Sequence, residues 1–445
     1  MPEIQGSQLE YANHTVLHPV GFSALLIAIY FLLKSHRDYV CFAVICMAAM
    51  IPSAQRITLV SIDFPFLRLL VMVALFRAYG YKRDAYPIRR LKPDQLIWCW
   101  GLWSIISQAL LYGTLAAAVT RAGYMIDAIG AYYVGRIYTS GPKSLENLIR
   151  LVRNLVCLSA AFFLLERLTG RNVFAAFGGV PFETLVREGR LRCQGPFPHA
   201  ILAGVFWTLF FPWLWAQYKN TSDKKSGYLI GLAAVIVVVG NTASSTPAGT
   251  LLMALFGIAL FQFRTKVSAL KWAALFILIL LHITMEKPVW HLLARVDLAG
   301  GSTGWHRYFL IDRAIANFGD WWLFGTRDPG SWGRQLFDVT NQFVLEGVRG
   351  GFLGLFFFTW FIVACFSQFG LGIKKAANLK DVRLIWACGV FLFASCTSFL
   401  GVSYFGQTVP VFFLMLGISV AVADHVTIRE SNRTLAPTSV LVSAR

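Results

Sequence analysis

Two stretches of the sequence contain closely spaced arginines of the kind that bind phosphate. They are residues 187–199 and residues 304–313. Their arginines are Arg187, Arg190, Arg192, Arg307 and Arg313. A guanidinium group donates two parallel hydrogen bonds to one phosphate or carboxylate, which a lysine ammonium does not do. We therefore expect these arginines to bind a phosphate-bearing substrate, with anionic lipid headgroups as the alternative ligand.

The first stretch runs directly into a long apolar segment. Gly195 permits a tight backbone, and Pro196 and Pro198 block a regular helix. The stretch is predicted to form a rigid basic lip at a membrane surface, ending at His199.

The second stretch alternates basic and aromatic residues, beginning with Trp305 and His306. Aromatic faces beside arginine suit sugar rings and pyrophosphate, but tryptophan also marks the bilayer interface. Composition does not decide whether Trp305 lines a glycan groove or lies at the bilayer interface. His306 is open to a chemical role and equally to a packing role.

Motifs for several other reactions are missing from the sequence. It contains no GxxxxGK[ST] phosphate loop, HExxH zinc site, CxxC pair or GxSxG elbow. The glycine-rich run at residues 300–304 lacks the lysine of a phosphate loop and is interpreted as a flexible turn. We expect neither a metal nor a cofactor.

The composition indicates a multi-pass membrane protein. Hydrophobic residues make up 57% of the 445 residues and charged residues 14%, with a mean hydropathy of +0.60. Soluble chains carry about 25% charge. The net charge of +18 must be divided between two sides of a bilayer, so it does not indicate nucleic-acid binding. Seven of the eight cysteines lie in apolar runs, and we expect no disulfide.

Thirteen apolar runs are candidate membrane spans, which predicts an all-α, multi-pass transmembrane bundle of about 12–13 spans. The runs are residues 16–33, 39–54, 60–75, 96–119, 124–138, 154–168, 201–218, 228–239, 249–263, 269–284, 351–366, 384–400 and 409–422.

Basic residues alternate between the loops and predict the orientation. One set of loops, with the C-terminal tail, holds 25 of the 40 lysines and arginines. By the positive-inside rule this set is cytoplasmic, which places the N-terminus outside and the C-terminus inside. Two long loops on the outer side, residues 166–198 and 285–340, break the pattern, and ten of their eleven basic residues are arginine. Inside the spans, we interpret Asp127 as paired with a basic residue.

Several short motifs between residues 154 and 369 resemble those of the bacterial O-antigen ligase and O-antigen polymerase (Wzy-like) superfamily. Arg192 with Gly195, Pro198 and His199 is similar to the family's arginine–glycine–proline entry into a span. The run from Asn241 to Thr246 resembles a serine-rich turn between spans. Gly304-Trp305-His306-Arg307, followed by Trp321 and Gly325, resembles the start of the large periplasmic loop.

A fourth element distinguishes the subfamilies. Ligases carry a histidine before Asn, Ser or Gln, then nine residues and Gly-x-x-Gly. Here the frame fits, but Thr340 stands in the place of the histidine before Asn341. The resemblance therefore implies a polymerase or related exopolysaccharide enzyme, with a ligase that has moved its base elsewhere as an alternative.

The resemblance implies a GT-C-like membrane glycosyltransferase in the bacterial inner membrane. Its substrate would be a polyprenyl-pyrophosphate-linked glycan, and its product O-antigen or exopolysaccharide. A chain-length regulator and other polysaccharide assembly proteins are the protein partners that it implies. Arg192 and Arg307 would stabilise the departing pyrophosphate, with Arg190 and Arg313 in support. Asp338, Glu346 and His306 remain alternatives for the general base. The remaining predicted substrate-binding residues are Arg187, His199, Trp305, Thr340 and Asn341.

Two other function classes remain open. A flippase for lipid-linked oligosaccharides would also need many spans and arginines facing phosphate, although its ionisable groups usually lie near mid-membrane. A non-catalytic partner would position an envelope synthase. We divide the chain into N-terminal spans (1–153), a core with the two loops (154–368), and C-terminal spans with a basic tail (369–445).

Overall fold

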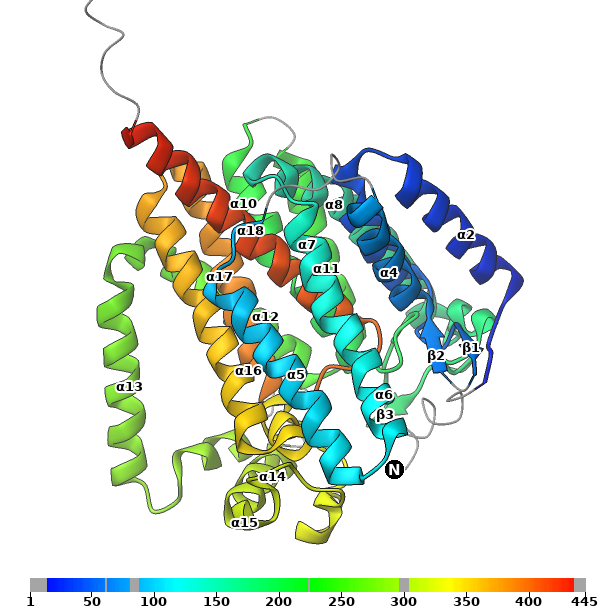
Figure 1. The fold of residues 1–445 in the computed structure, drawn as a ribbon, viewed down its shortest axis with the longest axis vertical. Coiled ribbons are helices and arrows are strands. Elements are labelled where there is room, and N and C mark those ends of the chain that lie inside the picture. The colour runs from blue at the N-terminus through cyan, green and yellow to red at the C-terminus, as the bar shows by residue number, and fades with distance from the viewer. Residues whose placement is uncertain (1–13, 61, 81–87, 223–224, 296–303, 436–445) are drawn as a thin grey trace, which may run out of the picture.

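The computed structural model describes residues 14–60, 62–80, 88–222, 225–295 and 304–435, and helices dominate this part of the chain (Figure 1). Helix accounts for 76% of the structure, with almost no sheet, which confirms the predicted all-α bundle. The glycine run predicted as a turn lies outside the described residues, apart from Gly304.

The N-terminal part consists of helices and one β-hairpin. Its elements are α2 (Pro19–Lys34), η1 (Arg37–Tyr39), α3 (Val40–Met50), β1 (Arg56–Leu59), β2 (Ile62–Pro65), α4 (Phe66–Gly80), α5 (Lys92–Tyr112), α6 (Leu115–Met125), the π-helical turn η3 (Ile126–Gly130) and α7 (Ala131–Ile137).

The central and C-terminal parts contain the longest helices. Their elements are α8 (Pro142–Thr169), η4 (Val173–Phe177), β3 (Val186–Arg187), β4 (Arg190–Leu191), α9 (Ala200–Thr208), α10 (Phe211–Asn220), α11 (Lys225–Asn241), α12 (Ser245–Ala259), η5 (Leu260–Lys266), α13 (Val267–Thr284), η6 (Val289–Arg295), α14 (Gly304–Ala316), α15 (Phe318–Trp321), η7 (Pro329–Trp332), α16 (Gln342–Lys375), α17 (Leu379–Phe399) and α18 (Thr408–Leu435).

Six helical segments among the described residues are long and apolar enough to cross a membrane, and two further apolar helices are shorter. The six are Pro142–Thr169, Ala200–Asn220, Ser245–Thr284, Gln342–Lys375, Leu379–Phe399 and Thr408–Arg433. They fit a membrane protein, and they are fewer than the thirteen predicted spans.

Two predicted span boundaries are wrong because local backbone chemistry interrupts the apolar runs. The run 96–119 is broken at Gly113, which adopts a left-handed φ of 66°, and the Thr114 hydroxyl then caps α6. The run 60–75 begins in the β1–β2 hairpin, so its helix starts only at Phe66.

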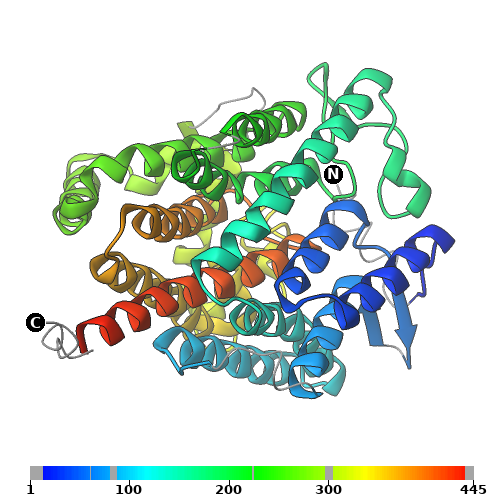
Figure 2. The same cartoon turned by 90° about the horizontal axis from the view of Figure 1, so that it is seen from above.

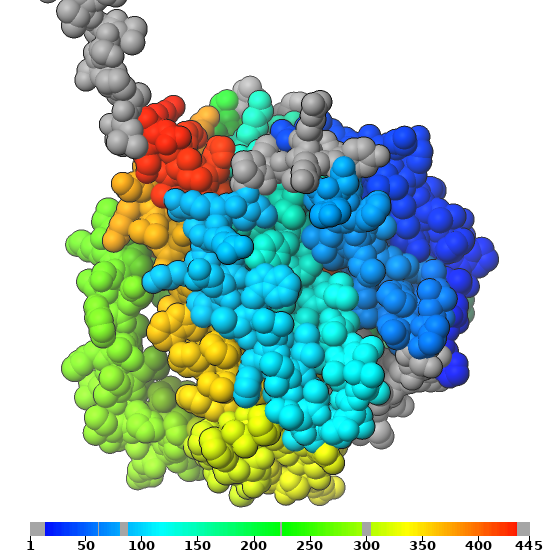
Figure 3. Space-filling view, in the orientation of Figure 1, coloured from blue at the N-terminus to red at the C-terminus, as the bar shows by residue number. Residues whose placement is uncertain are grey.

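The bundle has a buried centre and one helix outside it. In the segments Ala200–Asn220 and Thr408–Arg433, 89% and 83% of the membrane-length apolar stretch is buried inside the protein. Seen from above, α18 crosses the middle of the bundle (Figure 2). By contrast, α13 has no buried residue. It runs along the edge of the molecule, and openings separate it from α16 in the space-filling view (Figure 3).

One hydrophobic core extends from Leu25 to Val426, so all three predicted segments of the chain contribute to it. The core is rich in large aromatic residues, including the fully buried Trp100, Trp207 and Trp213.

Contacts between loops group them at the two ends of the bundle. At one end, Asn220 at the end of α10 donates to the Lys380 carbonyl at 3.1 Å, and Arg89 pairs with Asp424 at 3.2 Å. At the other end, Gln407 donates to the Pro196 carbonyl at 2.9 Å. The first group belongs to the loops predicted to be cytoplasmic, and the second contains the arginine-rich loops.

Candidate functional site

Arg192 and Arg307 converge on residues 244–246, where the turn after α11 leads into the start of α12, although they are far apart in sequence. Nη2 of Arg192 donates to the Ser244 hydroxyl at 2.6 Å, and Nη2 of Arg307 donates to the Thr246 hydroxyl at 2.7 Å. The structure thus brings together three predicted elements: the first loop, the serine-rich turn and the second loop. We call Arg187, Arg192 and Arg307 the arginine cluster.

The turn that receives these arginines is held by its own hydrogen bonds. Ala243 has a φ of 44°, and the Ser244 hydroxyl donates to the Thr242 carbonyl at 3.1 Å. The backbone N–H of Cys193 donates to the Asn241 carbonyl at 3.0 Å, which attaches the Arg192 segment to the same turn.

The predicted basic lip is a β-hairpin. Glu188 and Gly189, between β3 and β4, have φ values of 52° and 72°, as a two-residue type I′ turn requires. Arg187 lies opposite Arg190 in the register of the hairpin, so their side chains share one face, and side chains two residues apart along a strand share a face as well. The hairpin therefore presents Arg187, Arg190 and Arg192 on one side, with Arg190 exposed.

Glu166 at the end of α8 anchors the segment that follows the hairpin. This buried carboxylate accepts from the backbone N–H groups of Gln194 at 3.0 Å and Gly195 at 2.9 Å, and from the Thr184 hydroxyl at 3.2 Å. Gly195 has a φ of 55°, and a Cβ there would lie 2.7 Å from the Phe163 ring. In the sequence, Glu166 is marked only by its place near the end of the apolar run 154–168.

Cys193 lies inside this anchored segment and is completely buried. It is the one cysteine outside the apolar runs of the sequence, and the loop that carries it folds back onto the hydrophobic core. Burial raises the pKa of Cys193 to about 12.

Arg192 and Arg307 carry positive charge that no carboxylate among the described residues pairs with. Among the described residues, no carboxylate forms an ion pair with Arg192 or Arg307, and Nε of each is buried without a hydrogen-bond partner. Burial lowers the pKa of Arg192 and of Arg307, and the charge of Arg187 lowers both further. Arginine nevertheless remains protonated. An anion bound beside Arg192 and Arg307 would therefore offset their charge.

His199 lies beside this charge as the N-cap of α9. Its Nδ1 accepts from the Ile201 N–H at 3.1 Å, so the ring proton of the neutral form is on Nε2. Burial and the charges of Arg192 and Arg187 lower the pKa of His199 to about 3. At neutral pH it is an uncharged hydrogen-bond donor.

Trp305 and Arg313 lie on a different face of α14 from Arg307. Trp305 stacks on Phe309 with ring centroids 4.7 Å apart, and the Arg313 guanidinium lies 4.9 Å from the centre of the same ring. Residues four apart share one helix face, whereas Trp305 and Arg307 differ by about 200°. The structure thus groups Trp305 and Arg313 with each other, away from the Arg307–Thr246 contact.

Asp338, Thr340 and Asn341 lie just before α16. The His306 Nε2 is 3.3 Å from the Asp338 carbonyl oxygen, which joins this segment to α14. Burial raises the pKa of the Asp338 carboxyl, and the charge of His306 partly offsets that rise. The Thr340 hydroxyl is buried without a partner, and the Asn341 side chain caps α16 by accepting from Val344 N–H at 3.1 Å.

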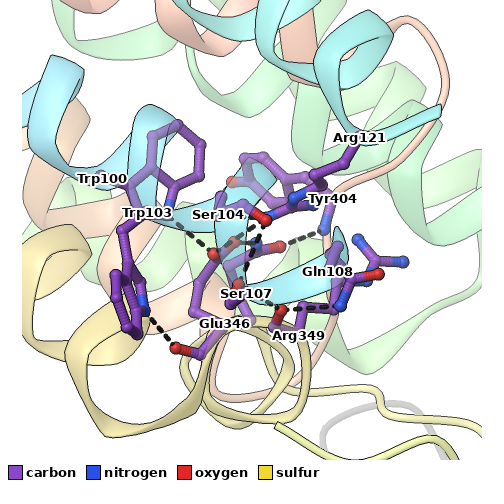
Figure 4. A network of polar contacts seen from close by, with 11 residues as sticks. Trp100, Trp103, Ser104, Ser107, Gln108, Arg121, Glu346, Arg349 and Tyr404 are labelled. Carbon is purple, nitrogen blue, oxygen red and sulfur yellow. Dashed lines mark hydrogen bonds and ion pairs between the residues drawn. The ribbon is translucent and has the colours of Figure 1, made fainter. Parts of the chain in front are cut away.

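Glu346 belongs to a separate buried network (Figure 4). Its carboxylate accepts from Trp100 Nε1 at 2.8 Å and Gln342 Nε2 at 2.7 Å, and lies 3.5 Å from Arg121. The side chain of Glu346 has no exposed surface. Among the three base candidates, these contacts give Glu346 a structural role.

The Asp127 carboxylate is paired with Arg68, as predicted. Arg68 donates from Nε at 2.9 Å and from Nη2 at 2.6 Å, which is a bidentate ion pair. The pair joins α4 to the π-helical turn η3.

No group of three or more potential metal-ligating side chains occurs within the described ranges. No protein-family model matches this sequence, and no curated protein matches it significantly.

Proposed function

We propose that this protein is a membrane glycosyltransferase that joins polyprenyl-pyrophosphate-linked oligosaccharides into a surface polysaccharide. The observation that carries the proposal is the convergence of Arg192 and Arg307 on one turn at a loop end of an apolar bundle. A buried cation without a carboxylate partner favours an anionic ligand. A lipid-linked pyrophosphate presents such an anion at the membrane surface.

In the proposed reaction, an acceptor hydroxyl attacks the anomeric carbon of the donor glycan. The new C–O bond forms as the bond to the pyrophosphate oxygen breaks, and the pyrophosphate leaves with the electron pair. Arg192 and Arg307 stabilise the charge that develops on it. Ser244 and Thr246 hold both guanidinium groups in place, Arg187 and Arg190 add positive charge, and neutral His199 donates a hydrogen bond.

The acceptor hydroxyl must also lose its proton. Asp338 is the favoured base because burial raises the pKa of its carboxyl, which makes the carboxylate a stronger base. Glu346 is less suited because its carboxylate is enclosed by Trp100, Gln342 and Arg121.

We place the active site on the periplasmic face of a bacterial inner membrane, with the N-terminus outside and the C-terminus inside. The grouping of lysine-rich loops at the opposite end of the bundle supports this orientation. The fixed anchoring of the first loop through Glu166 favours a static active site over the moving elements of a flippase.

The test uses purified protein in lipid vesicles with an undecaprenyl-pyrophosphate-linked repeat unit, and product length is read on a gel. We expect a ladder from the wild type, and none from Arg192→Ala or Arg307→Ala. Arg150→Ala, an exposed arginine on α8, is the matched control. A normal ladder from both cluster variants would refute the mechanism. One added band on a lipid A-type acceptor would identify a ligase instead.

A further inference from the structure

A cavity of about 430 Å³ lies among β1, β2, α4, α6, α16 and the loop before α18. Its charged lining residues are Arg56, Asp63, Arg68, Asp127 and Arg349. Small-ligand sites typically enclose about 300–1,000 Å³ and contain a few directed polar groups. This cavity is large enough for one or two sugar rings.

Two of the three lining arginines already have carboxylate partners within the cavity wall. Arg56 pairs with Asp63 at 3.1 Å, and Arg68 pairs with Asp127 at 2.6 Å. The Arg349 guanidinium forms no hydrogen bond or ion pair with any residue that the structure describes. The lining therefore carries one positive charge more than its carboxylates balance.

The backbone at Arg349 is fixed by a break in α16. Gly351 has a φ of 64°, and a Cβ there would lie 2.2 Å from the Leu323 carbonyl oxygen, so only glycine fits. The Arg349 carbonyl instead accepts from Gln108 Nε2 at 2.7 Å and the Ser107 hydroxyl at 3.2 Å (Figure 4). These contacts with α5 hold Arg349 at the cavity.

We propose that this cavity binds a sugar that carries one carboxylate, with Arg349 as its ion-pair partner. Arginine matches the geometry of a carboxylate. The Asp127 carboxylate, which accepts two hydrogen bonds from Arg68, retains lone pairs that can accept hydrogen bonds from sugar hydroxyls. A phosphate dianion carries more charge than the one positive charge left unbalanced in the lining, and it offers no comparable set of hydroxyl donors. These features favour an acidic sugar over a lipid phosphate.

The cavity adjoins the arginine cluster through the loop between α17 and α18. Gln407 lines the cavity and donates to the Pro196 carbonyl in the Arg192 segment at 2.9 Å. Gly401 lies against Arg307, where a Cβ would be 3.3 Å from the guanidinium carbon. Resting on the proposed function, we assign the cavity to the acceptor glycan, because the cluster already serves the donor pyrophosphate.

Binding is tested by saturation-transfer NMR on the full-length protein in detergent. The probes are methyl glucuronide and methyl galacturonide, with methyl glucoside and methyl galactoside as neutral counterparts and inorganic phosphate as competitor. We expect a uronide to bind more tightly than its neutral counterpart. Arg349→Gln should weaken that binding about ten- to hundredfold, as the loss of hydrogen bonds to a charged group predicts, whereas Arg150→Gln should not.

Equal binding of uronide and neutral glycoside would overturn the proposal, as would unchanged uronide binding by Arg349→Gln. Displacement of the uronide by equimolar phosphate would identify a phosphate site instead and also overturn it. The wild-type comparison of uronide with neutral glycoside stands even where a variant fails to fold.

Chain-growth assays separate this inference from the proposed function. Arg307→Ala should lose polymer and keep uronide binding, whereas Arg349→Gln should raise the acceptor KM with a smaller effect on kcat. Uronide binding without any wild-type polymer would remove the proposed function and leave the binding site. Polymer formation with an unchanged acceptor KM in Arg349→Gln would leave the proposed function and remove the assignment of the cavity to the acceptor.

Discussion

The arginines inside the helical bundle and those of the arginine cluster lie in opposite electrostatic surroundings. Arg68 and Arg121 face Asp127 and Glu346 at 2.6 and 3.5 Å. Arg192 and Arg307 face hydroxyl groups and the positive charge of Arg187. A buried charge with its partner belongs to the fold, whereas one without a partner raises the energy of the empty site and favours an anionic ligand. This contrast separates structural arginines from proposed functional ones.

The largest effect is expected from breaking a bundle pair. Arg121→Met leaves the fully buried Glu346 carboxylate without its cation, which should reduce the free energy of unfolding by about 3–5 kcal/mol. Unfolding in a titration with sodium dodecyl sulfate, followed by circular dichroism, measures this. The double variant Arg121→Met/Glu346→Met should recover much of the loss. A stable Arg121→Met protein would remove the structural role of the pair.

Arg192→Ala and Arg307→Ala should each slow polymer formation by about 10²–10³-fold, as the loss of one group that stabilises transition-state charge predicts. The same substitutions should change the free energy of unfolding by only about 1 kcal/mol, because one lost hydrogen bond is offset by relieved repulsion from Arg187. Initial rates and unfolding midpoints of the same preparations check this. The polymer formation rates of the Arg→Lys variants should lie between those of the wild type and the alanine variants, since lysine keeps the charge and loses the bidentate geometry. Full activity in the lysine variants would show that charge alone suffices.

Acidification should destabilise the protein through His199. Its pKa is about 3 in the folded state and 6.5 ordinarily, so the unfolded chain binds more protons between these values. Stability should therefore fall as pH decreases from about 6.5, by up to about 1.4 kcal/mol per pH unit. His199→Asn keeps a capping side chain and should flatten this slope when unfolding is measured between pH 6.5 and 4.5. An unchanged slope in the variant would assign the pH dependence to other groups.

The smallest effect is expected at the turn. Ser244→Ala removes the hydroxyl that accepts from Arg192, and should lower the polymerisation rate about tenfold, as the loss of one hydrogen bond to a charged group predicts. Ser419→Ala on α18 is the matched control, because that buried hydroxyl bonds to the Met415 carbonyl and the Cys388 thiol and not to an arginine. Equal rates for the two variants would remove the positioning role of Ser244.

The sequence predicts the helices well because long apolar runs have few other ways to satisfy their backbone in lipid. The sequence does not predict the ends of these helices well, because single residues determine where a helix ends. The left-handed Gly113 turns one apolar run into α5 and α6, and the β1–β2 hairpin replaces the start of another. The hydropathy of the sequence does not reveal either the turn at Gly113 or the hairpin.

For the site, sequence reasoning selects Arg192, Arg307 and the serine-rich turn, which the structure brings together. It also groups Arg313 with Arg307, although the four-residue spacing of Trp305, Phe309 and Arg313 indicates a separate helix face. Arg349 and its cavity have no sequence signature, because they depend on the break at Gly351 and on α5 packing against α16.

Arg192 and Arg307 together make up the proposed pyrophosphate site. The most direct test is the affinity of the detergent-solubilised protein for farnesyl pyrophosphate, a short polyprenyl pyrophosphate, with farnesol as the uncharged control. We predict binding by the wild type and by Arg349→Gln, and a loss of at least about a hundredfold in Arg192→Ala/Arg307→Ala. Farnesol should not show this dependence. Equal affinity of the wild type and the double variant for farnesyl pyrophosphate would show that these two arginines do not form a pyrophosphate site.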